Sequence, residues 1–332
     1  AGRQVHQAVW VALGLAVVGS TLLAAGQPFL WLAGGRLGAE VEQQARGYLL
    51  ALAFSLPASL LFTIYRGFNS AVSRPKAVML LQMGGLALKV PLSTLFVFGA
   101  PSLGLPALGA VGCGIATAIV MWTQAAAAFT VLRRDAFYAP FSLFGRGLAR
   151  PEPRAIRTLL GLGLPMGASI FVEVTGMSFM AFLIARSSST AVAGHQIAFN
   201  LAALLFMAPL AVGNATSTLV AQQIGATRRA AAWRIGWHGI ALGVGLAAAV
   251  GAVVWLLRSP VLGLYTKDPG VAAAAWPLLA WVALFHVADA VQNIAALVLR
   301  AWHVTRVPLA IYALAVWGVG LGGGYVLGEA VL

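Results

Sequence analysis

Residues 159–185 read LLGLGLPMGASIFVEVTGMSFMAFLIA, and residues 193–225 read AGHQIAFNLAALLFMAPLAVGNATSTLVAQQIG. Each stretch is longer than the ~20 predominantly apolar residues that a helix needs to cross a bilayer. The first carries one acid, Glu173, near its middle, where a carboxylate costs about 2.5–3.5 kcal/mol on insertion scales. We therefore interpret both stretches as membrane-spanning helices and Glu173 as a candidate functional residue.

The rest of the chain shares this apolar character. Of the 332 residues, 61% are hydrophobic and 9% are charged, whereas a typical soluble domain has about 25% charged residues. A net charge of +13 would suggest a nucleic-acid partner in a soluble protein. Here the bases lie mostly in short segments between apolar stretches, which membrane orientation explains better. The composition predicts an all-α polytopic membrane protein that contacts the lipid bilayer and binds no nucleic acid.

Hydropathy divides the chain into apolar spans separated by short polar segments. The longest polar segment carries several arginines, so we interpret residues 135–157 as a cytoplasmic linker between two helical lobes, residues 1–134 and 158–332. Nine spans are predicted, at residues 7–33, 44–66, 76–99, 106–132, 158–184, 193–219, 233–257, 273–299 and 307–328.

The distribution of basic residues predicts the orientation in the membrane. Lys and Arg gather on the cytoplasmic side of spans, and a cytoplasmic N-terminus puts most of them there. The cytoplasmic segments would then hold Arg3, Arg66, Arg74, Lys76, Arg133, Arg134, Arg146, Arg150, Arg154, Arg157, Arg228, Arg229, Arg234, Arg300 and Arg306. The outer segments would hold Arg36, Arg46, Arg258 and Lys267.

The chain also repeats itself at an offset of about 230 residues. RQVHQAVWVALGLAVVGSTLLAAGQPFLWLAG, from Arg3, resembles WRIGWHGIALGVGLAAAVGAVVWLLRSPVLGLY, from Trp233, and a further span follows each copy. Matching spans are separated by an even number of spans, which predicts a parallel repeat about an axis along the membrane normal. Because only the second copy is preceded by two further spans, we expect a twelve-span parent of two six-helix lobes. The chain would then lack the first two spans and the last.

Two acids lie at mid-membrane in the predicted spans, Glu173 and Asp289, both in the second lobe. A carboxyl group in a low-dielectric cavity near a second acid can hold a proton. Losing that proton, or exchanging it for a metal ion or an organic cation, would change the electrostatics of the lobe. The pair is therefore a candidate coupling site, with a sodium ion as one occupant. The competing interpretation is a structural acid hydrogen-bonded by a neighbouring Ser, Thr or Asn.

Polar side chains are available around this pair. Asp289, Gln292 and Asn293 are spaced i, i+3 and i+4 and so share one helix face. His286, three residues before Asp289, could relay a proton. Hydrogen bonding between helices is the competing interpretation for the whole set. The set comprises Gln196, Asn200, Asn214, His286, Gln292 and Asn293.

Lys89 lies deep in the third span, within LALKVPLSTLF. A lysine there cannot easily extend its ammonium group to the membrane surface. It therefore either lines a wet cavity in the first lobe or pairs with an acid.

These stretches resemble the multidrug and toxic compound extrusion (MATE) family, NorM-like branch. Residues 193–226 resemble the eighth family helix closely. FVEVTG at 171–176 and ADAVQN at 288–293 resemble the seventh and tenth, and LPALGAVGCGIATAIVMW at 105–122 resembles the sixth. The resemblance covers the whole chain, family helices 3–6 in the first lobe and 7–11 in the second.

The resemblance implies export of cationic, amphipathic drugs in exchange for inward sodium ions or protons, without a cofactor. It implies that Glu173 and Asp289 are the cation-site acids of the second lobe. A tyrosine that the family often has four residues before that aspartate is Phe285 here. Its hydroxyl is absent at this position, so both coupling ions stay open. We expect a monomer in a bacterial-type inner membrane.

Three other classes compete with this interpretation. A related flippase of lipid-linked precursors would favour an Arg-rich cavity for phosphates, and only Lys89 is buried among the bases. An intramembrane enzyme would need a motif such as HExxH or GxGD, which the spans lack. A channel or a purely structural bundle fits the lobe repeat and the two acids poorly.

Overall fold

The computed structural model describes residues 2–26, 38–100, 104–144, 147–185 and 188–326. Within these residues, nine helices are long and apolar enough to cross a membrane. This agrees with the predicted all-α polytopic membrane protein. The predicted ends of the first and last spans, residues 27–33 and 327–328, lie outside the described residues, as do Arg36 and Arg146.

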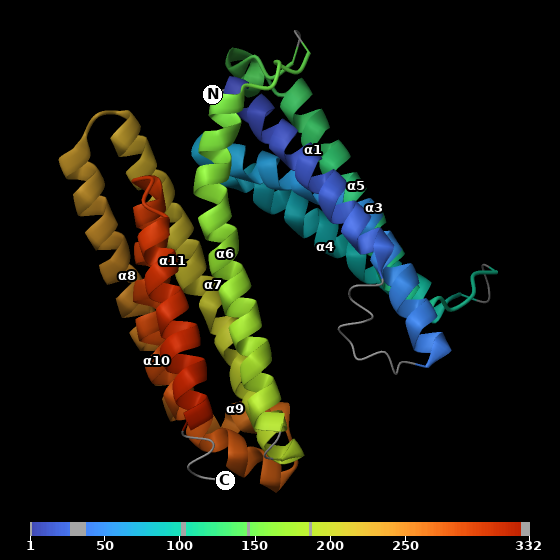
Figure 1. The fold of residues 1–332 in the computed structure, drawn as a ribbon, viewed down its shortest axis with the longest axis vertical. Helices are drawn as coiled ribbons and strands as arrows, with labels where there is room; N and C mark the ends of the chain where they lie inside the picture. Colours follow the sequence, from blue (N-terminus) through green and yellow to red (C-terminus); the bar gives the residue numbers. More distant parts are fainter. Residues whose placement is uncertain (1, 27–37, 101–103, 145–146, 186–187, 327–332) are drawn as a thin grey trace. The chain divides into compact units, whose positions relative to one another are not determined.

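The chain divides into two compact units, Ala1–Leu159 and Leu160–Leu332 (Figure 1). The division falls inside helix α6, Pro153–Ala185, so the polar segment before this helix belongs to the first unit.

The first unit is built on α5, whose small residues allow close packing. Gly112, Gly114, Ala116 and Ala118 are buried, and a side chain at Gly112 would collide with the backbone of Phe96. Small residues let membrane helices approach closely. Helix α5 therefore packs against both α3 and α4, and α1 packs against α3. The bounds are α1 Gly2–Ala25, α3 Ala39–Ala71, α4 Pro75–Phe98 and α5 Gly109–Arg134.

A 3-10 helix, η2 (Ala136–Phe141), follows α5 in the segment that the sequence predicts to be a linker. Its Tyr138 is buried and donates a hydrogen bond to Asn69 Oδ1 at 2.6 Å. Asp135 caps the helix by accepting from the backbone N–H of Phe137 at 2.9 Å. The segment after α5 therefore starts by folding back onto the end of α3.

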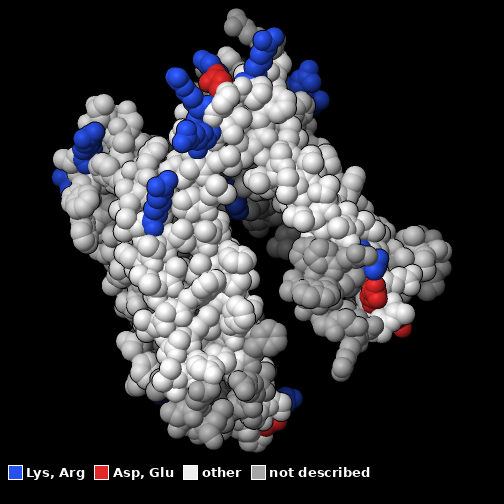
Figure 2. Space-filling view, in the orientation of Figure 1, with Lys and Arg blue, Asp and Glu red and all other residues white. Residues whose placement is uncertain are grey.

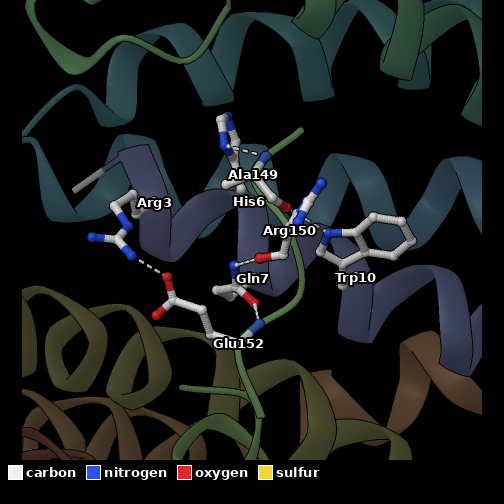
Figure 3. Close-up of polar contacts among 7 residues, drawn as sticks. All are labelled: Arg3, His6, Gln7, Trp10, Ala149, Arg150 and Glu152. Atoms are coloured by element: carbon white, nitrogen blue, oxygen red, sulfur yellow. Dashed lines mark hydrogen bonds and ion pairs between the residues drawn. The ribbon is translucent and has the colours of Figure 1, made fainter. Parts of the chain in front are cut away.

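The same segment is then held by α1 (Figure 3). Gln7, only 1% exposed, donates from Nε2 to the carbonyl of Arg150 at 2.9 Å, and its Oε1 accepts from the backbone N–H of Glu152 at 2.8 Å. Trp10 donates to the carbonyl of Ala149 at 2.9 Å, and Arg3 forms an ion pair with Glu152. Residues 149–152 are thus bound to the first unit up to the start of α6.

The second unit has a tightly packed centre of α7 (Ser189–Gly225), α8 (Arg229–Leu256) and α10 (Pro269–Ala301). The buried residues of α8 form a stripe of small side chains, including Gly236, Gly239, Gly243 and Gly251. This stripe brings α8 close to both other helices. Helix α6 and the last span approach this centre less closely. The last span begins as α11 (Arg306–Ala313) and continues as a π-helix, η3 (Leu314–Gly322).

The helix bounds reproduce the predicted internal repeat. Helix α3 and helix α10 each have 33 residues, and their first residues, Ala39 and Pro269, are 230 positions apart. Ser73 and His303, also 230 apart, follow these helices with left-handed φ values of 59° and 62°. After each, the next residue donates its N–H to the carbonyl five residues earlier. The two units therefore share the same helix–turn–helix geometry.

The sequence prediction missed two short helices. Helix η2 was predicted as linker, and α9, Arg258–Tyr265, as loop. Neither is long enough to produce a hydropathy maximum.

On the face drawn in Figure 2, charged side chains lie mainly near the ends of each unit, and the long flanks are largely uncharged. The exposed apolar flanks are the surfaces that would meet lipid.

Candidate functional site

Glu173 lies on the part of α6 that packs against the last span. Trp317 of η3 donates from Nε1 to the carbonyl of Val172 at 3.2 Å. A Cβ atom at Gly176 would lie 2.5 Å from Cγ1 of Val316, so a larger residue there would require Val316 to shift. Glu173 lies between Val172 and Gly176 in the sequence, and its side chain is half-buried.

Asp289 lies on the flank of the packed face of α10. That face consists of Ala275, Leu279, Ala283, His286, Ala290 and Ile294, all buried against the neighbouring helices. At 100° per residue, Asp289 lies about 60° from His286 around the helix axis. Its side chain is half-buried rather than enclosed in the packed centre.

The structure brings the two acids together within the second unit. The carboxyl groups of Glu173 and Asp289 interact electrostatically across the space between α6 and α10. The hydroxyl group of Tyr312, on α11, interacts electrostatically with both. Three polar groups from three helices of the second unit therefore lie within electrostatic range of one another.

Two buried polar atoms of α10 lie beside Asp289 in the sequence. His286 Nε2 and Asn293 Oδ1 are buried and have no hydrogen-bond partner among the described residues. Buried polar groups are normally paired with protein or with water. The oxygen atoms of two carboxyl groups and of Asn293 would suit a hard cation such as sodium, which prefers oxygen ligands. The same groups could hold a proton.

The remaining residues predicted for this site are spread more widely. Gln292 is half-buried, and Phe285 and Gln196 are exposed. Asn200 accepts a hydrogen bond from the hydroxyl of Tyr265 at 3.0 Å, and Asn214 Nδ2 donates to the carbonyl of Leu210 in its own helix at 2.8 Å. Asn200 is therefore hydrogen-bonded to another helix and Asn214 to its own helix, as expected if both asparagines have a structural role.

Lys89 lies in the first unit, where its ammonium group donates to Thr117 Oγ1 at 2.8 Å. It lines a groove of about 300 Å³ together with side chains from α3, α4 and α5. Of the two predicted environments for Lys89, a cavity is present, and no ion pair joins it to an acid among the described residues.

Sequence reasoning missed Tyr312 and the groove residue Arg66. In the sequence, Tyr312 is one aromatic residue in an apolar span, and only the folded unit brings it near the acids. Arg66 was assigned to a cytoplasmic helix end. Its spacing of i+3 from Thr63 and i+7 from Ser59 places it on one face with two hydroxyl side chains, a signal that was available.

Two multi-helix units with a parallel repeat are an architecture of membrane transporters. The MatE family model matches residues 1–95 and 165–326. A relative from Aromatoleum aromaticum named "Probable multidrug resistance protein NorM" is 42% identical over 324 residues, covering 98% of this chain and 69% of the relative.

Solved structures agree with this match. The MATE transporter NorM-NG, solved in complex with a bound compound and a monobody, is 31% identical, with a TM-score of 0.81, covering 99% of this chain and 71% of that one. "Outward-facing conformation of a multidrug resistance MATE family transporter of the MOP superfamily" has a TM-score of 0.87 at 18% identity, with coverage of 99% and 71%. The chain belongs to the MATE family of membrane transporters.

Proposed function

We propose that the protein exports cationic, amphipathic drugs by antiport against protons or sodium ions, with Glu173 and Asp289 as the coupling acids. The observation that carries the proposal is the electrostatic interaction of these two carboxyl groups between membrane-spanning helices of the second unit. Family membership supports it, as do the relative named as a multidrug resistance protein and the related transporter NorM-NG with its bound compound.

The coupling follows from charge. An ionised acid pair within the membrane is costly, so the pair favours a state in which it holds a proton, a sodium ion or a cationic drug. A drug that binds there displaces the proton or ion, and an incoming proton or ion displaces the drug. Competition for one site is sufficient for exchange, and the process needs no catalytic step and no cofactor.

The proposal includes the setting of the transporter. The protein works as a monomer in a bacterial-type inner membrane, with residue 2 and the segment 135–157 on the cytoplasmic side. The first unit corresponds to family helices 3–6 and the second to helices 7–11. The bases that precede α4 and α8, Arg74 and Arg228, support this orientation under the positive-inside rule.

The test is ethidium efflux from proteoliposomes that contain the purified full-length protein, driven by an imposed proton or sodium gradient. Glu173→Gln and Asp289→Asn should each reduce efflux at least about tenfold, the effect of losing roughly 1.4 kcal/mol of coupling. The matched control is Glu40→Gln, which removes an exposed acid at the start of α3. It should leave efflux unchanged.

The outcomes separate the parts of the proposal. Efflux driven by one gradient alone would identify the coupling ion. Full efflux in both acid variants would contradict the assignment of the acids and leave the transporter function standing. An absence of efflux in the unmodified full-length protein under either gradient would contradict drug antiport itself.

A further inference from the structure

A groove in the first unit carries positive charge and has no part in the proposed antiport. Helix α5 packs against both α3 and α4, whereas α3 and α4 approach each other far less, which leaves a groove between them with α5 as its floor. Its volume is about 300 Å³. Its polar lining consists of Ser59, Thr63 and Arg66 from α3, Gln82 and Lys89 from α4, and Gln124 from α5.

The charge in this groove is not neutralised by the protein. No described Asp or Glu lines the groove, and neither Arg66 nor Lys89 forms an ion pair with another described residue. The ammonium group of Lys89 has three donors, of which one is used by Thr117 Oγ1 at 2.8 Å. A lysine within a membrane span is costly, and an anion in the groove would offset that cost.

The floor of the groove is shaped by a close contact. Gln124 is 8% exposed, and its Nε2 donates to the carbonyl of Leu81 on α4 at 3.1 Å. A side chain at Gly85 would occupy the space that the Gln124 amide fills. The glycine and the buried amide together fix one polar side chain at the floor of the groove.

The internal repeat relates this groove to the acid pair of the second unit. Helices α3 and α10 start 230 residues apart, so Ser59 is the counterpart of Asp289 and Thr63 the counterpart of Asn293. At equivalent positions, one unit therefore carries an acid and an amide, and the other carries hydroxyl groups with Arg66 one turn further on. The acid and the amide of the second unit suit a cation, whereas the hydroxyl groups and the arginine of the first unit suit an anion.

We propose that the groove between α3 and α4 binds the anionic group, a phosphate or a carboxylate, of an amphiphilic molecule. Arg66 provides a planar fork that matches such a group in two hydrogen bonds, and Lys89 provides a point charge. Apolar side chains of Phe62, Leu86 and Met121 line the same groove and contact the apolar part of the ligand. An anionic lipid and a free amphiphilic anion share this chemistry.

Calorimetric titration of the purified chain in a neutral detergent tests the site, with decyl phosphate as the probe. Saturable binding is expected, with affinity reduced about tenfold or more in Lys89→Met and in Arg66→Met, because each loses a charge-assisted hydrogen bond. The matched control is Lys76→Met, which removes an exposed charge from the first turn of the same helix. Decyltrimethylammonium, with the opposite charge, should not compete.

A second arm distinguishes the two sources of the anion. Native mass spectrometry of protein extracted from mixed membranes would show retained phosphatidylglycerol, and not phosphatidylcholine, if the occupant is a lipid. Binding of decyl phosphate without lipid retention would identify a free amphiphile. Both results support the groove, and neither depends on transport by the acid pair.

Two results would overturn the proposal. One is the absence of decyl phosphate binding to the unmodified protein, and the other is an equal loss of affinity in Lys76→Met and Lys89→Met. If the groove variants do not fold, a photoreactive decyl phosphate can be applied to the unmodified chain. Labels on Phe62, Leu86 or Met121 would support the groove, and labels found only elsewhere would contradict it.

Discussion

Gln7 is one of the residues of α1 that hold the segment 149–152. Its buried amide makes two hydrogen bonds to the backbone, one to Arg150 and one from Glu152. Replacement by Met keeps the length of the side chain and removes both part-buried hydrogen bonds, which at about 1 kcal/mol each costs about 2 kcal/mol. Hydrogen exchange should then show the amide of Glu152 exchanging more than about tenfold faster.

The control for this prediction is Gln4→Met, an exposed glutamine on the same helix. It should leave the exchange of the Glu152 amide unchanged. Equal exchange rates in the Gln7 variant and the unmodified protein would show that Trp10 and Arg3 hold the segment without Gln7.

The environment of the Asp135 carboxyl should make the stability of the fold depend on pH. The hydrogen bond from the backbone N–H of Phe137, followed by the hydrogen bond and charge of Arg74, lowers the pKa of the Asp135 carboxyl below its ordinary value of 3.8. A carboxyl with a lowered folded-state pKa stabilises the fold above the unfolded-state value and loses that contribution as the pH falls through the folded-state value. Asp135→Asn should therefore be less stable than the unmodified protein at neutral pH and equally stable in acid.

Thermal unfolding of both proteins, followed from about pH 7 to about pH 3, measures this difference. The two unfolding temperatures should converge only below the ordinary pKa of the carboxyl. A gap that stayed constant across the whole range would show that the charge of Asp135 contributes nothing to stability.

At the residue scale, the sequence allowed the acids to be predicted but not their surroundings. Glu173 and Asp289 could be singled out because a charge in an apolar span is costly and therefore conspicuous. Tyr312 could not, because a tyrosine in such a span is unremarkable until the fold places it near both carboxyl groups. The partners of Gln7 lie more than 140 residues away in the chain, which no local pattern encodes.

At the scale of helices, Gly251 controls how closely α8 approaches α10. A Cβ atom at Gly251 would lie 2.8 Å from the carbonyl oxygen of Ala283, and a backbone atom cannot move aside as a flexible side chain can. Gly251→Ala should force the two helices apart and cost about 1–3 kcal/mol, as overpacking does. Equilibrium unfolding in mixed detergents measures this change.

Gly245→Ala, on the same helix, is the matched control. Nothing lies within 4 Å of a Cβ atom at Gly245, and alanine is favoured over glycine inside a helix by about 0.5–1 kcal/mol. This variant should be as stable as the unmodified protein or more stable. Equal destabilisation in both variants would show that chain flexibility, and not the contact with Ala283, decides the result.

Sequence patterns predicted the long helices well because hydropathy and length alone define a membrane span. The ends were predicted less accurately, since helices continue beyond the apolar core until a capping residue stops them. Helix α7 begins after Ser188, whose hydroxyl accepts from the N–H of Ala191, and α10 begins after Asp268, which accepts from Gly270. The π-helix after Ala313 had no local signal, because its composition is that of any apolar helix.

At the scale of the whole molecule, the internal repeat predicts on which side of the membrane particular turns lie. A parallel repeat requires that the turns after α3 and after α10 lie on the same side of the membrane. The positive-inside rule puts this side in the cytoplasm, since Lys76 lies in the first turn of α4 and Arg306 begins α11. Lys267, between α9 and α10, should lie on the opposite side.

Cysteine labelling in intact cells tests this condition, because the chain has one cysteine, Cys113, which can first be replaced by alanine. In that background, Lys267→Cys should react with a membrane-impermeant maleimide, whereas Lys76→Cys and Arg306→Cys should react only after the cells are opened. Reaction of the latter two alone in intact cells would reverse the orientation and preserve the repeat. Reaction of only one of them would contradict the parallel repeat, because the two units could then not cross the membrane in the same direction.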